Sequence, residues 1–263
     1  MTAITQILAR SEQGMTRPFI CKAGDQSTYY VKGRHAGLRS LCCEWVAGRL
    51  IKAVLPHTEL SVPEFSMIEV PGAILDASAR RDVRDLGVGT VFGSRMIAGG
   101  QELTWADTQV WTDETMALLI LVDLWIQNED RSLSELGGNP NLLTTRFAST
   151  PETTVGREPS LGIPSLWAYD FNLAFDSEFS RLRFFQSHVF GGLLGDWPEG
   201  FRDKMEGPLR SALHLVPEIF EELPLEWLHV DGDTTMPVQL DQMHVQSVLS
   251  LPFTESENFW SFS

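Results

Sequence analysis

Cysteine is scarce in this chain. Only 3 cysteines occur in 263 residues, and two of them, Cys42 and Cys43, are adjacent. Their odd number argues against a network of disulfide bonds, and their spacing fits no metal site. We interpret them as reduced, buried thiols, which predicts a cytoplasmic protein.

Basic residues are also few. Lysine and arginine number 20 against 35 aspartates and glutamates, so the formal net charge is −15. Nucleic acids and anionic membrane surfaces attract cationic side chains, so this balance argues against both as the main partner. It still allows a small phosphorylated ligand, because a few local cations and a metal ion can reverse the field inside a cleft.

Long hydrophobic runs are absent. The strongest run, residues 116–122, continues to Ile126 only through Asp123, and it is far shorter than the roughly 20 residues that cross a bilayer. Residues 1–10 lack the basic start and the apolar stretch of a secretory signal. We therefore expect no membrane segment, and we interpret the run as a helix in the protein core.

Several familiar catalytic motifs are missing as well. The sequence contains no Gly-x-Ser-x-Gly elbow and no Gly-x-x-x-x-Gly-Lys-Ser/Thr phosphate loop. Its 6 histidines include no pair at metal-binding spacing, and we interpret them as ordinary surface or core residues. His188 is the best outside candidate for a role at the edge of a site.

The first hundred residues are rich in strand formers separated by turn residues. The expected elements are strands at residues 4–8, 18–22 and 27–31, a helix at residues 41–55, and strands at residues 65–70 and 91–98. The helix is predicted because apolar residues recur there every three or four positions. An exposed connection or a short helix is expected at residues 71–88. Gly99 and Gly100 break the last strand, and we place a boundary between two lobes there.

The rest of the chain is predicted to be mainly helical. Thr112 is a suitable cap for a helix whose apolar part covers residues 116–127. The further expected elements are strands at residues 142–147 and 166–169, and helices at residues 200–215, 217–222 and 236–251. The predicted fold class is α+β, with a β-rich N-lobe at residues 1–99 and a mainly helical C-lobe at residues 100–263. We expect the aromatic tail around Trp260 to dock back on the C-lobe.

Two charged residues of the first lobe are candidates for holding phosphate. Lys32 follows the strand at residues 27–31, where a cation on a rigid sheet can neutralise the phosphates of a nucleotide. Glu44 lies in the helix at residues 41–55, where its carboxylate can pair with such a lysine and fix its direction. Taken singly, each residue fits a solvated surface charge better.

Three polar residues of the second lobe are candidates for the chemistry. Phosphoryl transfer needs a carboxylate near the attacking hydroxyl group, which suits Asp130 in the turn at residues 128–131. It also needs oxygen ligands for magnesium, which suits Asn141, directly before an apolar strand, and Asp170, which leaves another strand. The alternative for all three is an ordinary place in a turn, where Asn and Asp are common.

The order of these pieces resembles the HipA-like kinase family. The segments that carry the resemblance are Val31-Lys32-Gly33 and residues 41–45, 92–95, 128–131, 139–143 and 169–175. Each piece is short, and their order along the chain makes the resemblance specific. It covers about residues 14–175, and the C-terminal part contributes no motif.

The resemblance implies a two-lobed ATP-binding fold, similar to that of protein kinases and phosphoinositide kinases. Lys32 would contact the α- and β-phosphates and would be steadied by Glu44. The segment around Gly14 would lie over the phosphates. A hinge at Met96 and Ile97 would hold the adenine through backbone groups.

The resemblance also implies roles in the chemistry. Asp130 would be the base or orienting carboxylate, and Asn141 and Asp170 would hold magnesium. Ten residues separate Asp130 from Asn141, more than in such kinases, so Asn139 is a second candidate for the ligand. The implied function is transfer of phosphate from ATP, with Mg²⁺, to a serine or threonine of a protein. Two alternatives stay open: a pseudokinase that binds nucleotide without turnover, and a structural partner protein whose aspartates cap turns.

Overall fold

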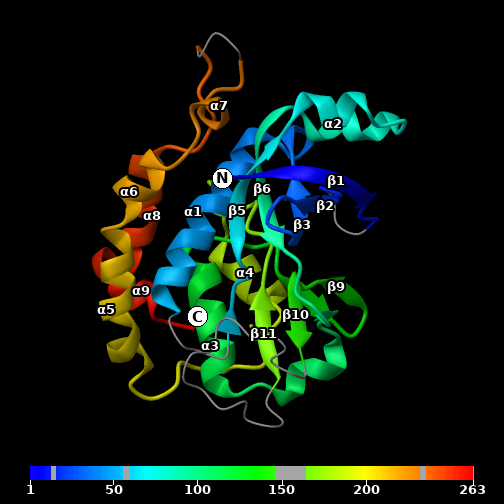
Figure 1. Ribbon diagram of the computed structural model, residues 1–263. Helices are drawn as coiled ribbons and strands as arrows, with labels where there is room; N and C mark the ends of the chain where they lie inside the picture. Colours follow the sequence, from blue (N-terminus) through cyan, green and yellow to red (C-terminus); the bar gives the residue numbers. More distant parts are fainter. Residues whose placement is uncertain (13–15, 56–59, 146–163, 232–234, 263) are drawn as a thin grey trace.

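The computed structural model describes residues 1–12, 16–55, 60–145, 164–231 and 235–262. Within these residues the chain is α+β, because strands dominate the N-terminal region and helices dominate the C-terminal one (Figure 1). The predicted fold class is confirmed at this level. No helix in the described part of the chain combines the length and the apolar character that a bilayer crossing needs.

Five strands of the N-terminal region close into a barrel. They are β1 (Thr2–Arg10), β2 (Phe19–Ala23), β3 (Thr28–Lys32), β5 (Phe65–Val70) and β6 (Gly89–Arg95), in the spatial order β1-β2-β3-β6-β5. Neighbouring strands are antiparallel, except that β1 and β5 pair in parallel and close the barrel. Val31 of β3 is fully buried in the barrel core. Because successive side chains of a strand alternate, Lys32 points out of the barrel, toward the next helix.

That helix, α1 (Leu38–Val54), is buried over most of its length. It contacts β6 on one side and α5, α6 and α7 on another. Gly48 of α1 allows a close approach, since a Cβ atom there would lie 2.8 Å from the ring of Phe65. Cys42 and Cys43 of α1 are buried free thiols, as predicted. Burial raises the pKa of each to about 12, so neither is a reactive thiolate at neutral pH.

A second sheet lies below the barrel in Figure 1. It contains β4 (Leu60–Ser61), β7 (Gln101–Glu102), β10 (Leu142–Thr145) and β11 (Ser165–Ala168), in the order β4-β11-β10-β7. A separate hairpin of β8 (Ser132–Ser134) and β9 (Gly137–Asn139) stands between Asp130 and Asn141. The sequence predicted a turn at residues 128–131 and no strands between it and Asn141, and the hairpin accounts for the ten-residue spacing.

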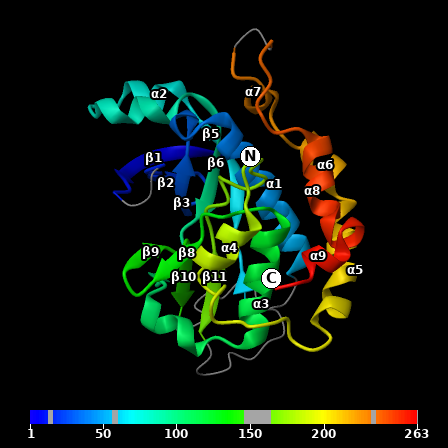
Figure 2. The ribbon, with the colours of Figure 1, turned by 180° about the vertical axis from the view of Figure 1, so that it is seen from behind.

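Helices form most of the remaining described structure. They are α2 (Gly72–Asp76), α3 (Asp113–Trp125), α4 (Arg181–Ser187), α5 (Phe201–Leu213), α6 (Val216–Glu221), α7 (Leu225–Leu228), α8 (Gln242–Thr254) and α9 (Ser256–Phe259), with 3₁₀ turns at Arg34–Ala36, Arg81–Leu86 and Trp105–Val110. Every residue of α3 from 115 to 125 is buried, as expected for a central helix. The helices α5, α6 and α8 lie beside α1, on the side away from the barrel (Figures 1 and 2).

Several predicted boundaries are wrong, and three of them have a clear local reason or lie near the site. The helix expected at residues 236–251 begins at Gln242, because the Asp241 carboxylate accepts hydrogen bonds from the first free backbone N–H groups. The strand expected to reach Ala98 ends at Arg95. The helix expected to reach Gln127 ends at Trp125, and Gln127 has a positive φ of 52°.

The aromatic tail docks back, as predicted. Trp260 is buried, and the Phe262 ring lies 4.8 Å from the ring of Trp197 and 5.0 Å from that of Phe185. These contacts attach the end of the described chain to the segment that contains α4 and the start of α5.

Candidate functional site

One cavity collects most of the residues that the sequence singled out. Its apolar lining includes Val62, Phe65, Phe92, Ile97 and Leu143, and its polar lining includes Ser11, Thr16, Lys32, Glu44, Asn139, Asn141 and Asp170. These side chains come from the barrel, from α1, from the second sheet and from the segment after β11. A site with both kinds of lining can enclose an aromatic base and hold charged groups beside it.

Lys32 lies between two carboxylates. Its Nζ atom is 2.5 Å from Glu44 Oε1 and 2.5 Å from Asp170 Oδ1. The other Glu44 oxygen accepts a hydrogen bond of 3.1 Å from the Phe171 backbone N–H. Lys32 is 7% exposed and Glu44 is 2% exposed, so neither is the solvated surface charge that each alone suggested. Lys32, Glu44 and the distant Asp170 therefore form one ionic cluster, which is buried at Lys32 and Glu44 and partly exposed at Asp170.

The cluster has an excess of negative charge. Burial alone would lower the pKa of Lys32, but the Glu44 and Asp170 carboxylates raise it to about 12. Burial raises the pKa of Glu44, with the Lys32 ammonium opposing it. Because one ammonium faces two carboxylates, the cluster can attract a further cation.

Asp130 is not among the described residues that line the cavity, but it lies directly beside both asparagines that the sequence left as alternatives, and these do line it. Its Oδ2 atom accepts hydrogen bonds from Asn141 Nδ2 at 3.1 Å and from Asn139 Nδ2 at 3.4 Å. Burial raises the pKa of Asp130, and the nearby Asp170 carboxylate raises it further. Such a carboxylate is a better proton acceptor near neutral pH than an ordinary aspartate.

Asn141 and Asp170 share an uncommon backbone conformation. Their φ angles are +48° and +61°, in the left-handed region. This conformation costs a residue other than glycine about 1–2 kcal/mol, although Asn and Asp tolerate it best. Both candidate metal ligands therefore have a strained backbone conformation, which is common at functional sites.

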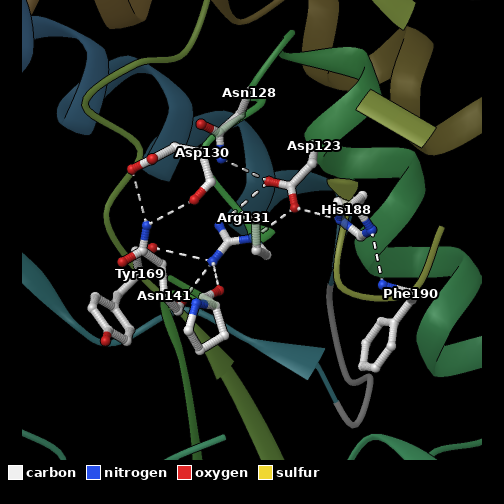
Figure 3. Close-up of polar contacts among 9 residues, drawn as sticks. Asp123, Asn128, Asp130, Arg131, Asn141, Tyr169, His188 and Phe190 are labelled. Carbon is white, nitrogen blue, oxygen red and sulfur yellow. Dashed lines mark hydrogen bonds and ion pairs between the residues drawn. The ribbon is translucent and has the colours of Figure 1, made fainter. Parts of the chain in front are cut away.

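A buried polar network lies behind these residues (Figure 3). At its centre Asp123, in α3, is fully buried and accepts hydrogen bonds from Arg131 Nε at 2.6 Å, Asn128 Nδ2 at 3.0 Å and His188 Nε2 at 3.1 Å. In the sequence, Asp123 stands out only as a break in an apolar run. The signal was present, because an acid inside a fully buried helix requires partners. The histidines were interpreted as ordinary surface or core residues, with His188 as an outside candidate for the edge of a site. Its imidazole is buried and contacts Asp123.

The protonation of His188 follows from its neighbours. The Phe190 backbone N–H donates to Nδ1 at 3.2 Å, so Nε2 carries the proton and donates to Asp123. Burial lowers the pKa of His188, and the Asp123 carboxylate opposes this. Burial of Asp123 would raise the pKa of that carboxyl group, but Arg131 and His188 hold it below its ordinary value. The network therefore contains a neutral imidazole and an ion pair.

We expect His188→Gln to reduce the loss of stability at acid pH. An unfolded histidine takes up a proton below about pH 6.5, whereas buried His188 resists it, so folding becomes less favourable as the pH falls. Glutamine does not titrate, so the wild-type advantage in free energy of unfolding should shrink between pH 8 and pH 5.5, by at most about 1.4 kcal/mol per pH unit. Urea unfolding at several pH values measures this. His214→Gln, at an exposed position, is the control for loss of a histidine. If the free energy of unfolding changes with pH in the same way in wild type and in His188→Gln, the prediction is wrong.

The remaining predicted residues are placed as follows. Gly14 lies outside the described residues, but Ser11 and Thr16 of the same β1–β2 turn line the cavity. Of the hinge pair, Ile97 lines the cavity. The Met96 backbone N–H instead donates to the Thr28 carbonyl at 2.9 Å, which continues the pairing of β3 with β6.

No ready-made metal cage is visible in the described ranges, where no three His, Cys, Asp or Glu side chains converge as metal ligands. Magnesium does not require such a cage, since it is commonly held by one or two protein oxygens together with phosphate and water. Asp170 and Asn141 both line the cavity and carry suitable oxygen atoms. Their chemistry therefore fits a magnesium ion that enters with a phosphorylated ligand.

Comparison with families of known proteins identifies a matching family. The family model described as HipA-like kinase matches residues 4–263, which is almost the whole chain and includes the C-terminal part that contributed no motif. No curated protein matches the chain.

Proposed function

The chain belongs to the HipA-like kinase family, and from this premise we propose that it transfers the γ-phosphoryl group of ATP to a serine or threonine of a protein. The observation that carries the proposal is the cluster in which Lys32 contacts both Glu44 and Asp170. A lysine fixed by a helix glutamate, next to a metal-binding aspartate, is the arrangement that phosphoryl transfer needs.

We also propose that the chain has the two-lobed fold of kinases. The N-lobe, residues 1–99, would contain the barrel and α1, and the C-lobe, residues 100–263, would contain Asp130, Asn141 and Asp170. The cavity is lined from both parts, which supports a nucleotide site between them. The packing of α1 against α5, α6 and α7 would then couple the lobes.

The N-lobe residues of the cavity would bind the nucleotide. Lys32 would hold the α- and β-phosphates, and Glu44 would keep its ammonium group in place. Phe65 and Val62 would enclose the adenine, and the backbone near Ile97 would supply its hydrogen bonds. The β1–β2 turn, closed by a hydrogen bond of 2.8 Å from the Ser11 N–H to the Pro18 carbonyl, would cover the phosphates.

The C-lobe residues would carry out the transfer. Asp130 would orient the acceptor hydroxyl and take its proton while the hydroxyl oxygen bonds to the γ-phosphorus and the bond to the ADP oxygen breaks. Asn141 is a better candidate than Asn139 for the metal ligand, because Asn141 is buried and has a left-handed backbone conformation, as Asp170 does. Magnesium held by Asn141 and Asp170 would neutralise charge on the phosphate oxygens.

Asp130→Asn tests whether the protein is an active kinase. Loss of the base should lower ATP consumption by about 10²–10⁴-fold. Stabilisation by ATP with Mg²⁺ should persist, because Lys32, Asn141 and Asp170 are unchanged. The measurements are ADP release and thermal unfolding, with Glu135→Gln, an exposed change in the β8–β9 hairpin, as the control. Wild type that is stabilised but consumes no ATP would instead identify a pseudokinase, and undiminished consumption by Asp130→Asn would refute the role of this residue.

A further inference from the structure

The geometry points to Asp123, Arg131 and His188 as a buried positioning unit that sets the backbone of Asn141 and Asp170. None of the three is among the described residues that line the cavity, so they would act through other residues. The inference rests on the proposed function for the roles of Asn141 and Asp170. The contacts themselves do not depend on that function.

Arg131 connects the ends of the two strands, β10 and β11, beside which the candidate metal ligands Asn141 and Asp170 lie. Its side chain is fully buried, and its Nη1 group donates to the carbonyl oxygens of Pro140 at 3.1 Å, Asn141 at 2.5 Å and Tyr169 at 3.3 Å (Figure 3). Pro140 and Asn141 precede β10, and Tyr169 follows β11. One guanidinium group therefore holds the backbone at Asn141 and directly before Asp170.

These carbonyl contacts fall where the backbone is strained. Asn141 and Asp170 both have positive φ, and such conformations persist only when the surroundings fix them. The Tyr169 N–H also donates to the Asn141 carbonyl at 3.1 Å, which ties the two strand ends together. The guanidinium of Arg131 lies 5.4 Å from the centre of the Phe171 ring, on the far side of Asp170 in sequence. Contacts before and after Asp170 thus depend on where Arg131 lies.

Asp123 fixes the position of Arg131. Its carboxylate accepts hydrogen bonds from Arg131 Nε at 2.6 Å and Arg131 Nη2 at 3.3 Å, a bidentate contact that sets the plane of the guanidinium. His188 donates to the same Oδ2 atom as Arg131 Nε, and the Val189 N–H donates to the Arg131 carbonyl at 3.0 Å. The Asn128 backbone N–H donates to the Asp123 carbonyl at 2.8 Å. The unit therefore also holds the start of the loop that carries Asp130.

An ion pair that only stabilises the fold would be buried in the same way. The test must therefore distinguish an effect on the backbone of Asn141 and Asp170 from an effect on the free energy of unfolding. Arg131→Lys keeps a positive charge opposite Asp123 but loses the planar fork that reaches three carbonyl groups. Leu209 of α5 is fully buried in the same hydrophobic core as α3. Leu209→Ala therefore destabilises that core but leaves Asp123, Arg131 and His188 unchanged. It serves as the matched control.

The first readout needs no ATP. Hydrogen exchange of the ligand-free protein should become faster in Arg131→Lys in peptides that cover residues 139–145 and 165–171, with no change in peptides of the barrel. Leu209→Ala should not show this local pattern. If the two variants give the same exchange pattern, the positioning role is overturned, whatever the protein does with ATP.

The second readout concerns magnesium. Arg131→Lys should raise the Mg²⁺ concentration needed for half-maximal ATP consumption by about 10–100-fold, the usual effect of losing a partner that orients metal ligands. Leu209→Ala should leave that concentration unchanged, and an unchanged value in Arg131→Lys would contradict the proposal. Failure of wild type to respond to ATP and Mg²⁺ would overturn the proposed function, whereas the exchange result would still decide the positioning role.

If Arg131→Lys does not fold, a pair of His188 variants decides the question. His188→Leu removes one donor to Asp123 and should give the same local increase in exchange and the same direction of change in Mg²⁺ requirement. His188→Gln keeps a side-chain N–H donor and should remain close to wild type in both. Equal behaviour of the two variants would overturn the proposal.

Discussion

Asp170→Asn is expected to abolish ATP consumption and the stabilisation that ATP gives in the presence of Mg²⁺. The change removes the carboxylate that contacts Lys32 and that would bind the metal, while asparagine tolerates the φ of +61° at this position. A metal contributes several kcal/mol of charge stabilisation, so turnover should fall by about 10³-fold or more. ADP release and thermal unfolding of the variant measure the two effects.

The control for this variant is Asp176→Asn. Asp176 lies in the same segment, outside the described lining of the cavity, and its carboxylate accepts a hydrogen bond from the Glu178 N–H. This change should leave ATP consumption and the Mg²⁺ effect near wild type. An Asp170→Asn variant that behaves like Asp176→Asn would show that Asp170 holds no metal.

Lys32→Met is expected to lower the stability of the ligand-free protein by about 3–5 kcal/mol at pH 7. Removing the ammonium group leaves the Glu44 carboxylate buried and unpaired and the Asp170 carboxylate partly buried and unpaired. The same change should prevent ATP binding, because the phosphates lose their cation. Urea unfolding and titration with a fluorescent ATP analogue measure the two effects.

A second substitution separates the charge effect from simple loss of packing. Glu44→Gln in the Lys32→Met background removes one of the unpaired carboxylates and should recover part of the lost stability, without restoring ATP binding. Lys204→Met removes an exposed lysine paired with Glu114 and should cost at most about 1 kcal/mol. If Lys32→Met costs no more than Lys204→Met, the two carboxylates do not depend on Lys32.

Local patterns in the sequence predicted most single elements but not how they combine. The strand at residues 65–70 and the long helices α1 and α3 follow from alternation, apolar periodicity and the Thr112 cap. Closure of the barrel could not be predicted, because the parallel pairing of β1 with β5 joins residues 66 positions apart, such as Thr2 and Ile68. The β8–β9 hairpin was not predicted, because its short strands consist largely of Ser, Gly and Asn, which are typical of turns.

The candidate site was predictable where several motifs occurred in order. Lys32, Glu44 and Asp170 were each ambiguous alone, and their succession along the chain brought them into one hypothesis before the structure brought them together. The support behind the site was not predictable in detail. Asp123 stood out in an apolar helix, but only the fold shows that Arg131 and His188 are its partners. The sequence motif contained Arg131 without indicating that its side chain faces inward.

Thermal unfolding of the wild-type protein with ATP, in the presence and absence of Mg²⁺, tests the central claim most directly. The account predicts that ATP with Mg²⁺, at about a hundredfold above its dissociation constant, raises the midpoint by roughly 5–10 °C, and that ATP without Mg²⁺ raises it much less. An unchanged midpoint with ATP and Mg²⁺ would contradict the claim that Lys32, Asn141 and Asp170 together hold a metal-bound triphosphate.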